Sequence, residues 1–238
     1  TTIIDSSSHG NNGTLYNNPS RVSGVRGQAL ALNGTNQYAV IPDNASLDIS
    51  NTITIMAWVK PAKQGTQYLV KKSIQMGTPG VDDGYELSLA AINSSDPPQG
   101  DGRAFVRFNQ TGSANTYRLN SVTPYPFDGN SWIHLAATYD GTTIKFYYNG
   151  VLEATKTASF QIATNSLPLG VGAQGDGGTP LQGQIDDARV YNYALDAEQI
   201  RTLASHSIVA SAGIGGTISP SGTIAIHQGG DTTFTITP

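Results

Sequence analysis

The stretch LAATYDGTTIKFYYNGVLEATKT, residues 135–157, contains two tight-turn dipeptides between alternating apolar runs. Asp140-Gly141 and Asn149-Gly150 suit the positive-φ geometry of short hairpin loops, so the stretch predicts an antiparallel meander of three strands. Side chains alternate between the faces of a strand. One face of the second strand therefore carries Ile144, Phe146 and Tyr148.

A second stretch, ITIMAWVKP at 53–61, is apolar on both faces, which is typical of a central strand covered on each side. Pro61 cannot donate to a strand ladder and is expected to end it. Residues 10–24 predict an irregular N-terminal loop. The next two strands are expected to pair around the turn at 33–36. The remaining predicted strands lie at 28–34, 37–42, 68–73, 84–92, 103–110, 117–122, 168–173 and 184–191.

One short helix is predicted over 195–204. Asp196 can cap its first backbone N–H groups with Gln199 three residues later, while Leu195 and Ile200 form an apolar staple. After Ser207 the chain becomes rich in Gly, Ser and Thr with small apolar residues between them, which predicts two or three short strands of a further module. We expect one domain over 1–207 and a partial β module or linker over 208–238.

The composition favours an all-β fold and excludes several classes of function. Charged residues make up only 13% of the 238 residues, and there are 27 Gly and 12 Pro, as expected for many short strands joined by turns. The chain has no Cys, so it can form no disulfide or thiolate site. A net charge of -4 without a basic cluster argues against nucleic-acid binding. We expect neither a signal peptide nor insertion into a membrane, because no apolar run is long enough, and the chain resembles an excised mature segment.

Four segments, in order, resemble the laminin-G-like jelly roll of the concanavalin-A-like lectin/glucanase superfamily. They are RGQALALNGTNQYAVI at 26–41, ITIMAWVKP at 53–61, WIHLAATYDGTTIKFYYNGVLEA at 132–154 and LQGQIDDARVYNYALDAEQIRTL at 181–203. The resemblance covers roughly residues 3–206. It implies a two-sheet antiparallel jelly-roll sandwich, secreted or attached to a cell surface as part of a larger bacterial protein. The tail resembles Gly/Ser/Thr-rich repeat modules of bacterial surface proteins.

The resemblance also implies a structural calcium between the N-terminal loop and a strand near the C-terminus. The matching donors are Asp5, Asn36 and Asp186, with His9 adding only its backbone carbonyl. Hard oxygen ligands suit calcium. The alternative is that these side chains cap loops by accepting hydrogen bonds from backbone N–H groups.

No catalytic residue is predicted. Glucanases of the superfamily carry two paired carboxylates on one strand, and this chain has no such run. Asp186 and Asp187 are adjacent and would point to opposite faces of a regular strand. The three glutamates are far apart in the sequence. His134, within an apolar strand, is expected to be a structural residue with satisfied hydrogen bonds.

Sugar recognition calls for an aromatic platform with planar polar groups beside it. The sequence places such side chains near turns, at Tyr85, Arg103, Arg107, Tyr117 and Arg118. We expect the arginines to face solvent on one sheet, with the loops at 81–84 and 95–102 flanking them. The alternative is ordinary exposed surface. Trp58 and Trp132 are expected in the core between the sheets.

The leading hypothesis is a non-catalytic recognition module for a polysaccharide or cell-surface glycan. One alternative is an adhesion or spacer domain whose partner is a protein. The other is a polysaccharide lyase or glycoside hydrolase with a site on the concave sheet face.

Overall fold

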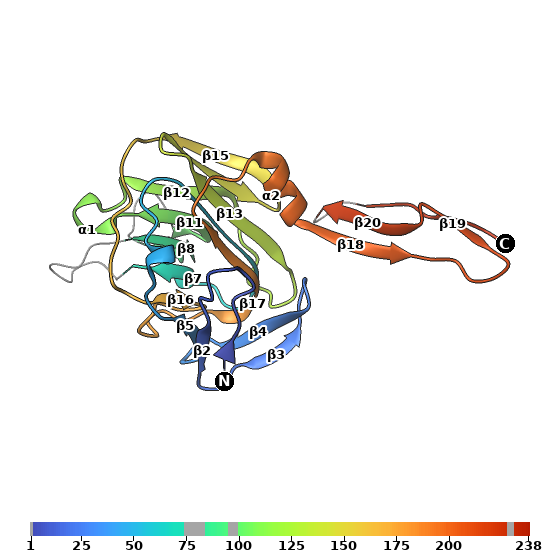
Figure 1. Ribbon diagram of the computed structural model, residues 1–238, viewed down its shortest axis with the longest axis horizontal. Helices are drawn as coiled ribbons and strands as arrows, with labels where there is room; N and C mark the ends of the chain where they lie inside the picture. Colours follow the sequence, from blue (N-terminus) through green and yellow to red (C-terminus); the bar gives the residue numbers. More distant parts are fainter. Residues whose placement is uncertain (1, 74–83, 95–99, 228–230) are drawn as a thin grey trace.

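The computed structural model describes residues 2–73, 84–94, 100–227 and 231–238. Two antiparallel sheets pack face to face as a jelly-roll sandwich, which confirms the predicted fold (Figure 1). The eight-stranded sheet, called sheet A here, runs in the order β1 (Thr2–Ile3), β2 (Gly13–Tyr16), β5 (Tyr38–Ile41), β16 (Leu169–Val171), β7 (Gln67–Lys72), β8 (Tyr85–Leu89), β11 (Arg103–Phe108), β12 (Tyr117–Pro124). The seven-stranded sheet B runs in the order β15 (Val151–Thr157), β14 (Thr143–Tyr148), β13 (Ile133–Tyr139), β6 (Ile53–Pro61), β17 (Gln182–Tyr191), β4 (Gln28–Asn33), β3 (Ser20–Ser23).

The predicted meander forms one half of sheet B. Strands β13, β14 and β15 pair in sequence order, and all pairings are antiparallel. One face of β14 points into the core between the sheets with Ile144, Phe146 and Tyr148, as the alternation predicts. Tyr147 lies on the opposite face.

Strand β6 is the central strand of sheet B. It pairs with β13 on one side and β17 on the other, and every residue except Lys60 is buried. One face contributes Ile53, Ile55, Ala57 and Val59 to the core. The other face contributes Met56 to a second apolar cluster outside the sandwich core. The prediction of a strand covered on both sides is therefore confirmed.

Two local expectations are wrong. Residues 10–24 are not a loop throughout, because β2 and β3 lie within them. Leu15 is buried while its neighbours in β2 are exposed, so one face of β2 points into the core. Strands β4 and β5 do not pair with each other, because the turn between them carries the chain from sheet B to sheet A.

Helix α2 (Ala197–Leu203) covers the outer face of sheet B. Asp196 and Gln199 form the predicted capping box, and each side chain accepts from the other residue's backbone N–H. Leu195 and Ile200 join Met56 in the second cluster, so the predicted staple also packs the helix onto the sheet. The structure has two further short helical turns, η1 (Ala45–Leu47) and α1 (Gln110–Ser113).

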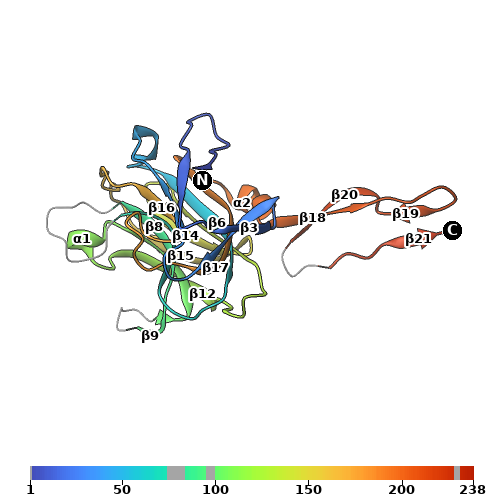
Figure 2. The ribbon, with the colours of Figure 1, turned by 90° about the horizontal axis from the view of Figure 1, so that it is seen from below.

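The last strands project away from the sandwich (Figure 2). β18 (Ser205–Ala210) pairs with β20 (Gly222–His227), and β19 (Thr217–Ser219) pairs with β21 (Thr235–Thr237). A further two-stranded pair joins β9 (Ile92–Ser94) and β10 (Gly100–Asp101). The expected domain boundary after residue 207 falls within β18. Among the described residues, no helix combines the length and apolar character needed to span a bilayer.

The two tryptophans do not lie between the sheets. Trp58 is fully buried, but on the outer face of sheet B, where the His206 ring of β18 lies 4.7 Å from it, centroid to centroid. Trp132 is only partly buried, and the Lys60 ammonium lies 5.3 Å from its ring centroid. The expectation that both indoles fill the core is wrong, because each projects from the face of sheet B that points away from sheet A.

Candidate ligand-binding site

The outer face of sheet A carries a buried ionic row across three strands. Lys71 and Arg107 lie opposite Glu86 on the two neighbouring strands, and both pair with its carboxylate. The Arg107 Nε donates to Glu86 Oε1 at 2.6 Å, and its Nη1 donates to Asn115 Oδ1 at 3.1 Å. Burial alone would raise the pKa of Glu86, but Lys71 and Arg107 hold it below its ordinary value.

Aromatic rings complete this row. The Arg118 guanidinium lies 3.9 Å from the Phe105 ring centroid, and Lys71 lies 4.3 Å from that of Tyr68. Arg103 is partly buried, and its Nη1 donates to the Ser121 carbonyl at 3.3 Å. Arg107 and Arg118 are both buried, so the expectation that these arginines face solvent is wrong.

The two tyrosines predicted beside these arginines point elsewhere. Tyr85 is in the sandwich core, where its hydroxyl donates to the Leu47 carbonyl at 3.1 Å. Tyr117 stacks on Phe160 with ring centroids 3.8 Å apart, at the edge of the core. The predicted set therefore divides into three arginines on one face and two tyrosines on the other, and it does not form one open platform. Of the flanking loops, 81–83 and 95–99 lie outside the described residues.

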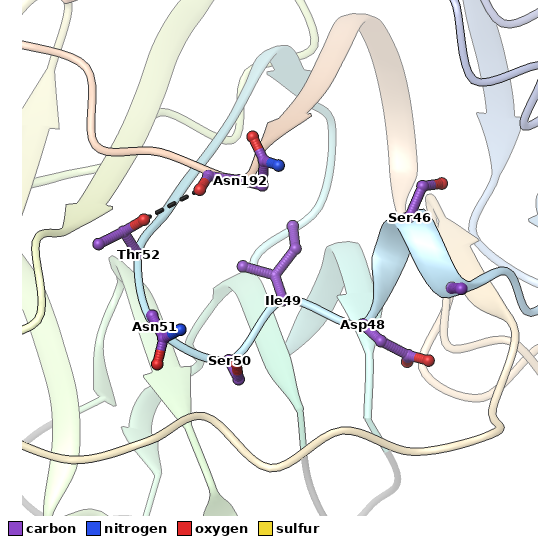
Figure 3. Close-up of a pocket in the computed structure, with 8 residues that line it drawn as sticks. Ser46, Asp48, Ile49, Ser50, Asn51, Thr52 and Asn192 are labelled. Atoms are coloured by element: carbon purple, nitrogen blue, oxygen red, sulfur yellow. Dashed lines mark hydrogen bonds between the residues drawn. The ribbon is translucent and has the colours of Figure 1, made fainter.

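A polar pocket of about 260 Å³ lies instead at one end of the sandwich (Figure 3). It is lined by Ala45, Ser46, Asp48, Ile49, Ser50, Asn51, Thr52 and Asn192. These residues come from η1, from the segment leading into β6 and from the turn after β17. Apart from the Ala45 and Ile49 side chains, the lining groups are hydroxyl, amide and carboxylate groups, which can both donate to and accept from a polar ligand.

Two side chains of sheet A, Lys72 and Tyr85, hold one wall of this pocket. The Lys72 ammonium is buried and pairs with Asp43 at 2.6 Å and with Asp48 at 3.4 Å. The Tyr85 hydroxyl donates to the carbonyl of Leu47, in η1. Residues 43–48 are thus tied to the strands that carry Lys72 and Tyr85, and the pocket wall is preorganised.

Threonine hydroxyls hold the opposite wall. Thr52 Oγ1 donates to the Asn192 carbonyl at 2.9 Å (Figure 3), and Thr54 Oγ1 donates to the Tyr193 carbonyl at 2.8 Å. The side chain of Tyr193 is 49% exposed. Its ring centroid lies 5.4 Å from that of Tyr191, whose hydroxyl accepts from Arg189. The exposed Tyr193 directly follows Asn192 of the pocket lining, and it lines the larger cavity that adjoins the pocket.

A larger cavity, of about 790 Å³, adjoins the polar pocket and shares Ser46, Ile49 and Asn192 with it. We call it the inter-sheet cavity, because apolar residues of both sheets line it. Its mouth is lined by residues 4–9 of the N-terminal loop, by residues 186–189 of β17 and by Tyr193. The N-terminal loop and the segment around η1 project on the same side of the sandwich (Figure 2).

Three of the four residues expected to hold calcium line this cavity, namely Asp5, His9 and Asp186. Asn36 does not. Asn36 follows the C-terminal end of β4, which pairs with Gln182. Asp186 lies next to the N-terminal end of β4, so the two residues are at opposite ends of this strand. The Asn36 side chain accepts from Asn33 Nδ2 at 3.1 Å.

The two carboxylates already serve as loop caps. Asp5 accepts from the backbone N–H groups of Ser7 and Asn11 and from the Ser7 hydroxyl. Burial raises its pKa and these hydrogen bonds lower it, with a net shift below the ordinary value. Asp186 accepts from the backbone N–H groups of Arg26 and Asp187. In the described part of the chain, no three His, Cys, Asp or Glu side chains form a metal cluster.

A β-bulge between Asp186 and Arg189 changes the expected placement of the paired aspartates. Asp187 has a φ of 48° there, and its carboxylate pairs with Arg26 at 3.2 Å and Arg189 at 2.7 Å. Because Asp186 accepts from the backbone of the same Arg26, both carboxylates meet one residue. The expectation of opposite faces assumes a regular strand, and the strand is irregular at this point.

The glutamates lie on three separate elements. Glu86 is in the ionic row of sheet A, Glu153 accepts from the Thr123 hydroxyl, and Glu198 pairs with Arg201 on α2.

His134 is fully buried, and neither ring nitrogen has a hydrogen-bond partner among the described residues. Burial, reinforced by the charges of Arg26 and Arg189, lowers its pKa to about 3. The histidine is buried as expected, but it is not satisfied.

The sequence interpretation missed the polar pocket and Tyr193. Two signals were available: the Asp-, Asn- and Ser-rich run at 43–51 before a central strand, and the alternation of Tyr191 and Tyr193 after β17. Neither signal shows that the two segments meet, because more than 130 residues separate them in the sequence.

Comparison with known proteins gives a family and a set of folds. A laminin G family model, described as the concanavalin A-like lectin/glucanases superfamily, matches residues 33–201. The adhesion G-protein coupled receptor V1 of Danio rerio is 23% identical over 153 residues. That match covers 63% of this chain but only 2% of the receptor.

Solved structures of similar fold include the binding domain of Paraclostridial mosquitocidal protein 1, with a TM-score of 0.62 and 19% identity. The match covers 84% of this chain and 48% of that chain. Domain 4 of AbnA, an extracellular GH43 arabinanase of Geobacillus stearothermophilus solved with arabinotriose, has a TM-score of 0.59 and 23% identity, over 81% of this chain and 87% of that chain. The binding domain of botulinum neurotoxin DC, solved with SialylT, has a TM-score of 0.61 and 12% identity, over 84% and 47%.

Proposed function

The chain belongs to the concanavalin A-like lectin/glucanases superfamily, and on this premise we propose that it is a non-catalytic recognition module that binds a carbohydrate at the polar pocket beside Tyr193. The observation that carries the proposal is the combination of an exposed tyrosine with a preorganised pocket of hydroxyl, amide and carboxylate groups. An aromatic face packs against the apolar side of a sugar ring, and the polar groups pair with its hydroxyls.

Two features of the chain support a binding role without catalysis. The three glutamates lie on separate elements, and each has its own partner. This arrangement does not resemble the two carboxylates, about 5 to 10 Å apart in one cleft, that glycoside hydrolysis uses. Similar folds include a neurotoxin binding domain solved with SialylT and a domain of an arabinanase solved with arabinotriose. We extend these properties to this chain by proposal, because the likeness itself concerns only the fold.

The context of the module is part of the same proposal. We place it outside the cell, within a larger protein that attaches to a polysaccharide or a glycan-bearing surface. The similarity to a short segment of an adhesion receptor supports this placement. Calcium at the mouth of the inter-sheet cavity stays a prediction, and no step of recognition is derived from it.

A glycan array tests the proposal with matched variants. Tyr193→Ala and Asn51→Ala should each weaken retention about fivefold on the glycans that the unmodified chain binds, since each removes a ligand contact worth about 1 kcal/mol, on the order of an aromatic stack or a hydrogen bond. Phe127→Ala is the control, because Phe127 is also 49% exposed but lines neither the polar pocket nor the adjoining cavity that Tyr193 lines. Retention that survives Tyr193→Ala, or arrays without signal, would shift the assignment to a protein-adhesion or spacer domain.

A further inference from the structure

The inter-sheet cavity is an opening in an otherwise closely packed core. Side chains in protein interiors normally leave few voids larger than a water molecule. In the middle of the sandwich this holds, since Ile53, Ile55 and Val59 are 0% exposed. Next to the cavity, Ile49 and Val171 are each 7% exposed and Ile41 is 6% exposed. The cavity reaches these three core residues from one end of the sandwich.

The walls of the cavity are apolar and come from both sheets. Sheet A contributes Ile41, Val70, Leu169 and Val171. Sheet B contributes Leu30, Ile185 and Val190, and Leu47 and Ile49 complete the lining between them. A volume of about 790 Å³ is within the range of small-molecule sites, and apolar walls with a few polar groups are typical of such sites.

The mouth is polar, and its charged groups already have partners within the chain; Arg21, which also lines the cavity, donates to the Thr2 carbonyl. Asp187 pairs with Arg26 and Arg189, and Asp5 is surrounded by N–H and O–H donors. A ligand entering there meets serine hydroxyls and amide groups without a surplus of either charge. The chemistry at the entrance suits an uncharged head rich in hydroxyl groups.

The cavity and the polar pocket are continuous, because Ser46, Ile49 and Asn192 line both. We infer that one amphipathic ligand occupies the two together, with a neutral sugar in the polar pocket and an apolar chain or aglycone in the inter-sheet cavity. This inference rests on the proposed function for its sugar head and goes beyond it in naming the class of ligand, a glycoside with an apolar aglycone.

Calorimetric titration of the whole chain with methyl, butyl, hexyl and octyl β-D-glucoside tests the inference, with octyl glucoside kept below its critical micelle concentration. Each methylene that enters an apolar site should lower Kd by about fourfold, until the chain fills the cavity. An affinity that does not change along the series would overturn the inference.

Variants of the cavity wall locate the effect. Val171→Phe fills the cavity and should remove the dependence on chain length. Val122→Phe is the matched control, since Val122 is 55% exposed on β12 and does not line the cavity. If Val171→Phe fails to fold, Ile41→Ala serves in its place. Ile41→Ala widens the cavity, so affinity should continue to rise with glucosides of longer alkyl chain. A chain-length dependence that neither wall variant alters would place the alkyl group elsewhere and overturn the inference.

The two proposals fail separately. An array whose signal depends on Tyr193, together with a flat glucoside series, overturns the amphipathic ligand and leaves sugar binding in place. A silent array overturns the proposed function whatever the glucoside series shows.

Discussion

Glu86 and His134 are both fully buried, and their partners give them opposite protonation behaviour. Glu86 has two cationic partners and keeps its charge, whereas His134 has no hydrogen-bond partner among the described residues and stays neutral.

Strand alternation correctly places Arg103 and Arg107 on one face of β11, because the period of a strand is a local property. It cannot predict that Arg107 is buried, since burial depends on what covers the face.

Removing the charge of Glu86 should destabilise the fold by about 3 to 5 kcal/mol, because Glu86→Gln leaves buried cations without their carboxylate. The pKa of Glu86 lies below its ordinary 4.5, so the ionic contribution is present above that pH and is lost as pH falls through the lower folded value. Urea unfolding should therefore show a constant difference in the free energy of unfolding between the variant and the unmodified chain above about pH 5, and this difference should shrink at lower pH. Glu198→Gln, at an exposed pair, should change stability by less than about 0.5 kcal/mol.

Replacing His134 should have little cost at neutral pH and should help in acid. Both ring nitrogens are buried without a partner in the described structure, so His134→Phe should be neutral or stabilising. The folded pKa of about 3 lies below the ordinary 6.5, so the unfolded chain takes up a proton first, and stability falls as pH drops from 6.5 toward 3. The free energy of unfolding, measured between pH 6.5 and 3, should not show this loss in His134→Phe. The control His9→Phe should show the same loss as the unmodified chain. If the pH dependence of His134→Phe matched that of the unmodified chain, the histidine would already be paired.

At the level of strands and helices, the elements predicted best are those specified by neighbours in sequence. The meander of β13 to β15 follows from its two turn dipeptides, and α2 follows from the capping box of Asp196 and Gln199. Strands β4 and β5 were expected to pair because the turn between them is short. Only the packing of the two sheets decides that this turn crosses from one sheet to the other, and no local pattern records it.

The contact between β18 and the sandwich can be measured at Trp58. In a Trp132→Phe background, Trp58 is the single indole, and its ring lies 4.7 Å from that of His206. His206→Ala should shift Trp58 emission to longer wavelength and make it more accessible to acrylamide, at a cost of about 0.5 to 1.5 kcal/mol in stability. His9→Ala should change neither; if His206→Ala also changes neither, β18 does not shield the indole in solution.

At the scale of the whole molecule, the candidate site is assembled from segments that are distant in sequence. Asp5, Ile49, Asp186 and Tyr193 come together only when the N-terminal loop, the segment before β6 and the end of β17 meet at one end of the sandwich. Strand and turn patterns are local and predict an all-β chain, and the resemblance to the laminin-G-like family predicts the sandwich. It could not predict this site, because the meeting of these ends depends on the global topology.

The calcium prediction is also tested on the whole domain. If a metal binds the folded chain at Asp5 and Asp186, calcium should raise Tm, and a chelator should lower it in the unmodified chain but not in Asp5→Ala. An unchanged melting curve would leave both carboxylates as loop caps, which is the arrangement of their hydrogen bonds here.

Chemical-shift mapping of the backbone amides during titration with the glycan that the array selects tests the central claim most directly. Binding at the loop end of the sandwich predicts perturbations concentrated at residues 45–52 and 191–193, with few on β11 and β12. Perturbations centred instead on Arg107 and Arg118 would contradict the account and return the binding site to the outer face of sheet A.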